Sequence, residues 1–328
     1  REVRAEAVSW EAALELIHQG FNRVIERFGP QSILPFNYAG PHGQLAGGSM
    51  DRRFFHKLGA SLLDRGPLCG AVRGTAYTSL FGPAPGMPPE QARNADMIAV
   101  WGNNVTVSNL HLARVIKSAR EQGAKLVVVD PKRTKIAEQA DLYIQIQPGT
   151  DVVLALALAR ELERRGKFDA PFIERWVYGF DQYMEQARQT TPAQACQTCA
   201  ITEQQFDALL AHYANAKTLS LSVGNGIERG HSGGSGLRAI MALNVLLGQL
   251  GRPGAGIFAK PALAVPLDSE RLQRPDLIPV GTRTINIVDV GRLLLDDAMD
   301  PPIKALFIYN HNPLCTHPDQ NRMRRALS

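Results

Sequence analysis

One thiol in this sequence stands out as a group that could do chemistry. Cys69 lies in a segment rich in glycine and proline, residues 65–74, rather than in an apolar strand. A cysteine in such a turn can serve as a metal ligand or a nucleophile, and the alternative is an inert buried thiol. The pair Cys196 and Cys199 is a weaker signal, because zinc needs four ligands and no second pair has suitable spacing. We interpret that pair as structural.

A second group of residues has the spacing of a nucleotide site. Gly102, Asn103 and Asn104 follow an apolar run and precede a helical pattern. Backbone amides at such a position can bind phosphate, and the glycine allows close approach. Asp130 ends the next apolar run, where an acid often accepts hydrogen bonds from a ribose, although it could also cap the turn before Pro131. The pattern is not Gly-x-Gly-x-x-Gly, which argues against an ordinary nicotinamide site.

Asp151 closes the run Gln-Pro-Gly-Thr-Asp and has two interpretations. It could cap a helix that starts at Val152, which is the simpler interpretation of the residue types. Alternatively, its two oxygens could accept hydrogen bonds from N1–H and the 2-amino group of a guanine. The residues alone leave both interpretations open.

These residues belong to a predicted strand–helix–strand unit over residues 97–151. Its loops fall at the carboxyl ends of its strands, where an open parallel sheet binds ligands. An apolar run followed by a loop rich in glycine or asparagine recurs at 219–226 and 304–313. The sequence therefore predicts further loops of the same kind.

The alternation of strands and helices predicts an α/β fold with parallel sheets, and 328 residues leave room for two domains. We expect two doubly wound, mostly parallel lobes, one inserted in the other. Residues 1–66 plus 265–328 form a discontinuous lobe, and residues 67–264 form an inserted Rossmann-like lobe. Ser9 predicts the start of a helix with an apolar stripe, and Thr202 with Gln205 predicts a capping box.

Composition excludes several classes of protein. The net charge of +5 comes from basic residues scattered among acids, which argues against nucleic-acid binding. Four cysteines do not indicate a disulfide framework and favour a reducing compartment, the cytoplasm. No run reaches the length of a membrane span. The sequence opens at Arg1 without Met and ends within a helical pattern, so we interpret it as a central fragment.

In order along the chain, the motifs resemble those of molybdopterin oxidoreductases of the dimethyl-sulfoxide-reductase type. Trp-Gly-Asn-Asn-Val-Thr-Val-Ser-Asn-Leu-His is similar to the family's Gly-x-Asn-Pro … His loop. Val-Asp-Pro-Lys-Arg-Thr-Lys-Ile-Ala-Glu-Gln-Ala-Asp is similar to its Asp-Pro-Arg … Ala-x-x-Ala-Asp. The resemblance covers nearly the whole chain and implies a molybdenum or tungsten cofactor with two pterin guanine dinucleotides.

The resemblance implies a role for each candidate residue. Cys69 matches the position that supplies the metal's protein ligand. Asp151 would read a guanine, which reverses the preference for a helix cap, although both roles can coexist. Asn312 and Pro313 would serve the second dinucleotide from the other lobe. The other residues that would meet the first dinucleotide are Gly102, Asn103, Asn104, Asp130, Lys132, Gly149, Gly224 and Gly226.

Three positions depart from the family pattern. Gly70 stands where formate dehydrogenases of this type have histidine, which argues against formate chemistry. Asn104 is followed by Val105 rather than proline, and Asn310 replaces the usual glycine of the last loop. The family's cysteine cluster for a [4Fe-4S] centre and its closing domain are not in this sequence. We expect them in the complete protein and expect the chain by itself to be inactive.

The function implied by the resemblance is two-electron redox chemistry at the metal. It would act on a small-molecule substrate and exchange electrons with a partner protein or domain. One alternative is a cofactor-free homologue that serves as a subunit scaffold, as in the large respiratory NADH dehydrogenase subunit. Another is a subunit similar to those of formylmethanofuran dehydrogenase.

Overall fold

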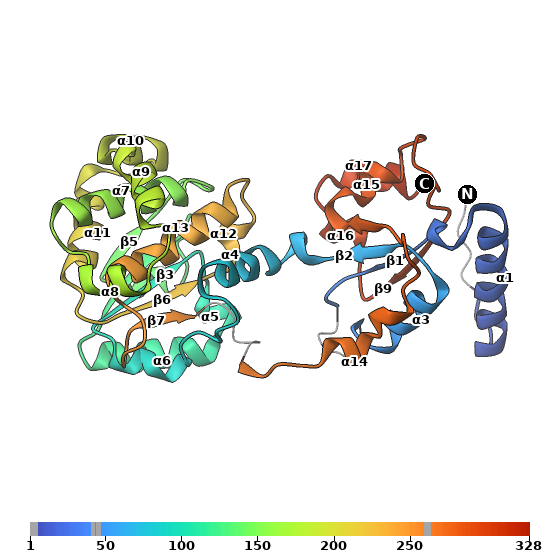
Figure 1. Cartoon of the computed structure of the whole chain (residues 1–328), viewed down its shortest axis with the longest axis horizontal. Coiled ribbons are helices and arrows are strands. Elements are labelled where there is room, and N and C mark those ends of the chain that lie inside the picture. The colour runs from blue at the N-terminus through green and yellow to red at the C-terminus, as the bar shows by residue number, and fades with distance from the viewer. Residues whose placement is uncertain (1–5, 41–42, 44–46, 259–263) are drawn as a thin grey trace. The chain divides into compact units, whose positions relative to one another are not determined.

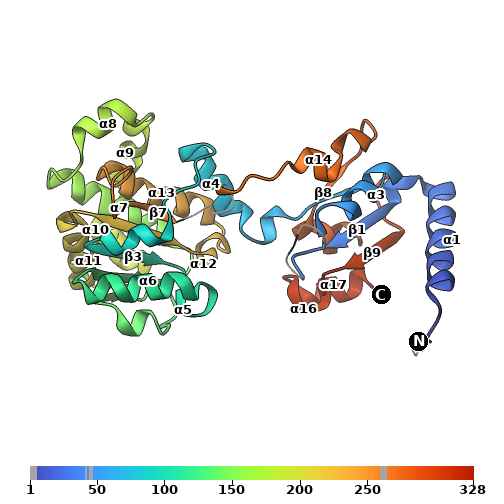
Figure 2. The ribbon, with the colours of Figure 1, turned by 90° about the horizontal axis from the view of Figure 1, so that it is seen from below.

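The structure, a computed structural model, describes residues 6–40, 43, 47–258 and 264–328. The chain divides into two compact units (Figure 1 and Figure 2). The discontinuous unit comprises Arg1–Leu68 and Leu267–Ser328, and the inserted unit comprises Cys69–Pro266. Every pair of named strands is parallel, so the α/β fold class expected from the sequence is confirmed.

The inserted unit is built on a five-stranded sheet with the order β5-β4-β3-β6-β7. The strands are β3 (Met97–Trp101), β4 (Lys125–Val129), β5 (Leu142–Ile144), β6 (Leu219–Val223) and β7 (Gly256–Phe258). From β3 the chain moves outward to β4 and β5, and it then returns to place β6 on the other side of β3. The sheet therefore has a topological switch point between β3 and β6.

Helices cover both faces of this sheet, as expected for a buried parallel sheet (Figure 1). Alternate residues of β3 serve the two cores, because Ile98 and Val100 face α6 while Ala99 and Trp101 face the larger core on the other side. α6 (Leu110–Glu121) covers the first face. The second core includes α4 (Ala71–Phe81), α7 (Asp151–Arg164), α9 (Phe180–Gln189), α10 (Pro192–Cys199), α11 (Glu203–Asn215) and α13 (Gly233–Leu246).

Shorter helices complete the inserted unit. They are α5 (Val105–Ser108), α8 (Ala170–Trp176) and α12 (Asn225–Glu228). The predicted capping box at the start of α11 is confirmed, because Thr202 accepts from the Gln205 backbone and the Gln205 side chain accepts from the Thr202 N–H. Within the described ranges, no helix of either unit is long and apolar enough to cross a membrane.

The discontinuous unit joins two segments that lie more than 200 residues apart in sequence. β1 (Ile33–Asn37) pairs with β9 (Ala305–Tyr309), and β2 (Leu62–Asp64) pairs with β8 (Thr284–Asn286). Each pair takes one strand from each end of the chain. Its helices are α1 (Trp10–Phe28), α3 (Met50–Leu58), α14 (Ser269–Gln273), α15 (Val290–Leu293), α16 (Pro313–Thr316) and α17 (Gln320–Ala326).

The first helix of this unit begins where the sequence predicts, and its apolar stripe is only partly covered. Ser9 caps α1 by accepting from the Ala12 N–H at 3.2 Å, as expected. Phe21 packs against the core of the unit, but Trp10 is 81% exposed and Leu14 is 60% exposed. The apolar stripe is therefore partly buried in the second half of the helix and exposed in the first.

The core of the inserted unit contains one buried side-chain hydrogen bond that we expect to be costly to remove. Trp101 Nε1 donates to Tyr213 Oη at 3.0 Å, and both residues are buried. Tyr213→Phe leaves the indole N–H without a partner, so we expect the free energy of unfolding to fall by about 1–3 kcal/mol. Urea denaturation measures this loss. Tyr178→Phe, at a fully exposed ring, is the control and should change nothing; equal losses would contradict the assignment.

Candidate functional site

The loops that follow β3 and β6 meet at the switch point of the inserted sheet. The Gly224 N–H donates to the Trp101 carbonyl at 2.9 Å, and the Gly226 N–H donates to the Gly102 carbonyl at 3.3 Å. A Cβ on Gly224 would lie 2.0 Å from the Gly102 carbonyl oxygen, which no side chain can accommodate. Gly102 itself has φ +56, a left-handed conformation that favours glycine. These three glycines allow the two loops to touch.

A cavity of about 510 Å³ opens where these loops meet. Asn103 and Asn104 line it, and within the described part of the chain their backbone N–H groups donate to no residue. The Asn103 side chain is engaged instead, because its Nδ2 donates to Ser222 Oγ at 2.8 Å. The side chain therefore fixes the loop while the backbone donors are left for a ligand. The other lining residues that matter here are Arg73, Gly102, Asn225 and Gly226.

Asp130 follows β4 and is 8% exposed. Its Oδ1 accepts from the Lys132 backbone N–H at 2.8 Å, so the turn-cap interpretation of this residue is correct for one carboxylate oxygen. Burial raises the pKa of Asp130 above its ordinary value, against the opposing effect of the Lys132 backbone hydrogen bond and charge. The Lys132 side chain is exposed and forms no ion pair with any residue that the structure describes.

Asp151 is the first residue of α7, and the N-cap position belongs to Thr150. The predicted capping role is therefore wrong, because the helix begins one residue earlier than the sequence suggests. The carboxyl group is 8% exposed, and burial raises its pKa to about 6, with a further contribution from the charge of Asp130. The two acids thus influence each other at the carboxyl edge of the sheet.

The loop that carries Asp151 is held from two sides. The Gln147 N–H donates to the Cys199 carbonyl at 2.9 Å, and Cys199 Sγ donates to the Thr150 carbonyl at 3.6 Å. On the other side, Ser232 Oγ donates to the carbonyl of Gly149, which is exposed and has φ +81. Burial raises the thiol pKa of Cys199, as it does for Cys196, so these thiols pack rather than react.

Cys69 is half-buried in the inserted unit, two residues before α4. Asn225 Nδ2 donates to its Sγ at 3.8 Å. The Arg73 N–H, in the first turn of α4, donates to Glu228 Oε2 at 2.8 Å. The structure therefore brings Cys69 to residues 223–228, the end of β6 together with α12, which also include Gly224 and Gly226. We call these residues the β6–α12 segment.

Sequence reasoning missed four residues of this site. Asn225 stands between two glycines that the sequence singled out, so the motif Gly-Asn-Gly could have indicated it. Nothing in the spacing of Arg73, Ser222 or Glu228 relates them to the other members. Their roles depend on contacts between segments about 120 to 155 residues apart.

Asn312 and Pro313 follow β9 in the discontinuous unit. Pro313 is buried at the start of α16, and Asn312 is exposed in the N-cap position. Asn310, the departure from the family's glycine, has φ +51. Asparagine is the residue other than glycine that best tolerates this conformation, so the replacement preserves the loop.

A cationic cluster that the sequence did not indicate lies at the carboxyl end of β1. Asn37 Nδ2 and Arg52 Nε are buried without a partner among the described residues. Arg65 Nη1 donates to the Gly47 carbonyl at 3.1 Å, and its pKa is lowered by burial and by the neighbouring charge of Arg52. Two adjacent arginines with unused donors are suited to an anion.

The geometry agrees with a comparison of the sequence against known families. The family model described as molybdopterin oxidoreductase matches residues 4–328. The chain belongs to the molybdopterin oxidoreductase family. This confirms the resemblance, and membership implies a molybdenum or tungsten pterin cofactor.

Individual relatives support the same family. The chain is 32% identical to the probable oxidoreductase YoaE of Bacillus subtilis (strain 168), over 98% of this chain and 47% of that protein. It is 25% identical to formate dehydrogenase H of Escherichia coli (strain K12), over 77% of this chain and 36% of that protein. The chain thus spans about half the length, or less, of the curated relatives it matches.

A solved structure shares the fold of this chain. Acetylene hydratase from Pelobacter acetylenicus matches with a TM-score of 0.82 and 20% identity, over 98% of this chain and 49% of that chain. At this identity the likeness concerns the fold alone. It shows that the α/β fold of this chain also occurs in that protein.

The raised pKa of Asp151 predicts that this residue destabilises the fold at neutral pH. Between pH 3.8 and about 6 the folded state binds more protons than the unfolded state, so stability falls as pH rises through this window. Asp151→Asn should therefore stabilise the protein by up to ~3 kcal/mol at pH 8 and change it little at pH 4. Denaturation at the two pH values measures this. The exposed Asp207→Asn serves as a control, and an equal gain there would refute the assignment.

Proposed function

We propose that this chain is the central part of a molybdenum or tungsten bis(pterin guanine dinucleotide) oxidoreductase. The observation that carries the proposal is the switch-point cavity, where glycine contacts bring two loops together. The backbone N–H groups of Asn103 and Asn104, which line it, have no partner among the residues that the structure describes. A ligand that fills such a cavity needs oxygen acceptors for these donors. A pyrophosphate supplies them, and the nearby Arg73 adds a positive charge.

Asp151 would read the guanine of the first dinucleotide. An ionised carboxylate offers two acceptors in one plane for the N1–H and 2-amino groups. With a pKa near 6, this group is mostly ionised at neutral pH, and hydrogen bonds from guanine would stabilise the ionised form further. Asp130 has one carboxylate oxygen engaged by Lys132, which leaves the other for a ribose hydroxyl, and the exposed Lys132 ammonium would meet a phosphate. Gly149 keeps the loop before Asp151 open, because it presents no side chain.

Cys69 would be the protein ligand of the metal. Within the described ranges, no three His, Cys, Asp or Glu side chains could together hold a metal ion. A single thiolate suits a soft metal that arrives with dithiolene sulfur ligands of its own. When bound, such a cofactor supplies two-electron redox chemistry at the metal, and this chain binds and orients it.

The discontinuous unit would hold the second dinucleotide. Asn312 and Pro313 lie at the carboxyl end of β9, beside the end of β1 in the parallel pair. Arg52 and Arg65 follow β1 in sequence and offer donors and positive charge for a phosphate. Buried polar atoms without partners are costly unless a ligand satisfies them.

The substrate would be a small molecule, and electrons would pass to a partner protein or domain through a [4Fe-4S] centre outside this chain. Formate is disfavoured because Gly70 has no side chain to act beside the metal ligand. Gly70 has space for one, since its nearest neighbour to an added Cβ is Arg73 Nη2 at 3.7 Å. We place the complete protein in the cytoplasm.

The experiment that tests this proposal is metal and pterin analysis of the complete protein, purified from a host that makes the cofactor. We expect molybdenum or tungsten together with pterin and guanine. In the Cys69→Ala variant, turnover should be abolished while pterin content stays close to wild type, because the dinucleotide contacts remain. Cys315→Ala is the matched control, since Cys315 is exposed in the other unit. A complete protein without metal and pterin would instead support the cofactor-free scaffold, and retained activity in Cys69→Ala would eliminate the ligand assignment.

A further inference from the structure

We infer that Asn225 and Glu228 are positioning residues for Cys69: Asn225 directs the sulfur, and Glu228 locks the start of the helix that follows it. The inference rests on the proposed function in treating Cys69 as a metal ligand. It adds that the β6–α12 segment, beyond its contact with the cavity, determines where the thiolate lies.

Three hydrogen bonds join residues 69–73 to the β6–α12 segment. Asn225 Nδ2 donates to Cys69 Sγ at 3.8 Å. The Arg73 backbone N–H donates to Glu228 Oε2 at 2.8 Å, and Arg73 Nη1 donates to the Val223 carbonyl at 3.1 Å. The contacts reach the segment at both of its ends. A turn held at both ends has little freedom to reorient the sulfur between them.

Glu228 acts as a cap supplied from another helix. Arg73 is the third residue of α4, and the backbone N–H groups of a first turn have no partner within their own helix. Gly70, at the N-cap, has no side chain to satisfy them. A carboxylate there also interacts favourably with the positive end of the helix dipole. Glu228 therefore supplies the cap that the sequence around Gly70 lacks, and it joins the start of α4 to α12.

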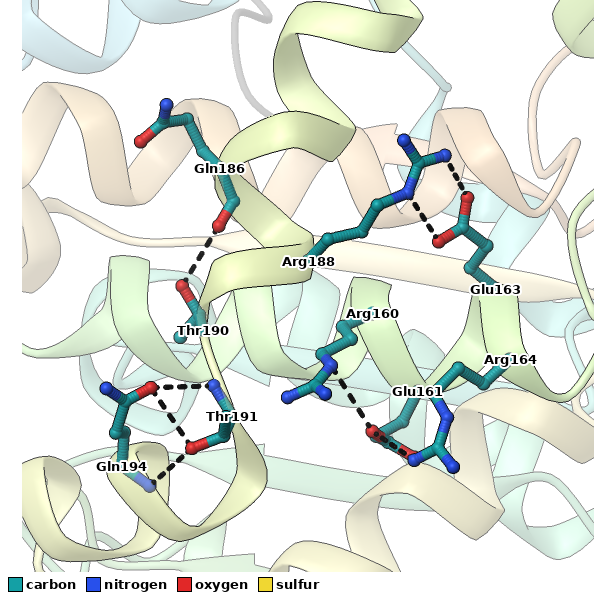
Figure 3. Close-up of polar contacts among 9 residues, drawn as sticks. All are labelled: Arg160, Glu161, Glu163, Arg164, Gln186, Arg188, Thr190, Thr191 and Gln194. Carbon is teal, nitrogen blue, oxygen red and sulfur yellow. Dashed lines mark hydrogen bonds and ion pairs between the residues drawn. The ribbon is translucent and has the colours of Figure 1, made fainter.

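The burial of Glu228 shows that this is not an ordinary surface contact. The residue is 6% exposed, its Oε1 has no partner, and it forms no ion pair with a described residue. Glu161, a second buried glutamate in the part of the chain that the structure describes, differs: both of its oxygens lie 3.1 Å from Arg164 Nη1 (Figure 3). An acid buried without a cation costs stability. Glu228 lies at the start of α4, which begins two residues after Cys69, so we infer that this loss of stability is tolerated because Glu228 holds that helix in place.

Asn225 would also tune the metal through the sulfur. An N–H donor to a coordinating thiolate withdraws electron density from it, and hydrogen bonds to sulfur ligands are a recognised control of redox potential. Loss of the donor makes the thiolate a stronger electron donor and stabilises the oxidised metal. The midpoint potential should therefore become more negative when the amide is removed.

The test uses the complete, cofactor-loaded protein and four variants. Asn225→Leu removes the donor at similar size, Glu228→Met removes the cap, and Glu228→Gln keeps a cap acceptor. Glu161→Gln is the matched control at a buried glutamate away from the site. Midpoint potentials come from redox titration followed by electron paramagnetic resonance, together with metal and pterin content.

We expect Asn225→Leu to keep its metal and pterin but to show a more negative potential than wild type. Glu228→Met should shift the potential as well, and Glu228→Gln should restore the wild-type value, which a merely structural role of the glutamate would not predict. Glu161→Gln should match wild type. A wild-type potential in Asn225→Leu, or an equal shift in Glu161→Gln, would overturn the inference.

A second measurement separates this inference from the proposed function. Iodoacetamide labelling of the 1–328 chain, followed by mass spectrometry, compares Cys69 with the exposed Cys315 as internal standard. Glu228→Met should raise the relative rate at Cys69 about fivefold, which corresponds to loss of a ~1 kcal/mol cap, and Glu228→Gln should not. Equal rates in wild type and Glu228→Met defeat the positioning role. A wild type without metal but with this rate difference defeats only the metal assignment.

Discussion

The backbone contact between Gly102 and Gly224 is the constraint on which the rest of the inserted unit depends. The β3 and β6 loops must touch for the cavity at the switch point to exist, and only the absence of a side chain permits the touch. Once the loops are in contact, the Asn103 side chain can donate to Ser222 Oγ, and Asn103 itself lines the cavity. A substitution at either glycine would separate the loops and lose the site together with the contact.

Burial of charge is the second organising feature of the molecule. Asp130 and Asp151 are buried near each other, and Glu228 is buried and forms no ion pair with any residue that the structure describes. The discontinuous unit holds positive charge in a similar way, because Arg65 is half-buried beside Arg52. Such groups lower stability in the free chain. At the carboxyl ends of parallel strands, a ligand of opposite charge or with matching hydrogen-bonding groups would offset the free energy lost by burying these charges.

Much of the site could be predicted from sequence because its members are short-range features. Gly102 and Asp130 each follow an apolar run directly, and Asp151 closes the short turn after the next strand. Strand ends in a parallel sheet converge on one edge whatever their order. Helix caps at Ser9 and Thr202 are equally local and were found where expected. The half-exposed stripe of α1 was not foreseeable, since an amphipathic pattern does not state what is available to cover it.

The sequence by itself determined the class of the fold, the strand ends and, through the order of its motifs, the family. Tertiary structure alone decided which loops meet. The strand order β5-β4-β3-β6-β7 brings residue 224 to residue 102. The same placement of β6 beside β3 lets Asn225 donate to Cys69 Sγ and lets Glu228 accept from the Arg73 N–H. Local propensities extend over a turn or a strand and carry no information about partners about 120 to 155 residues away. Those partners are chosen by the packing of whole strands and helices.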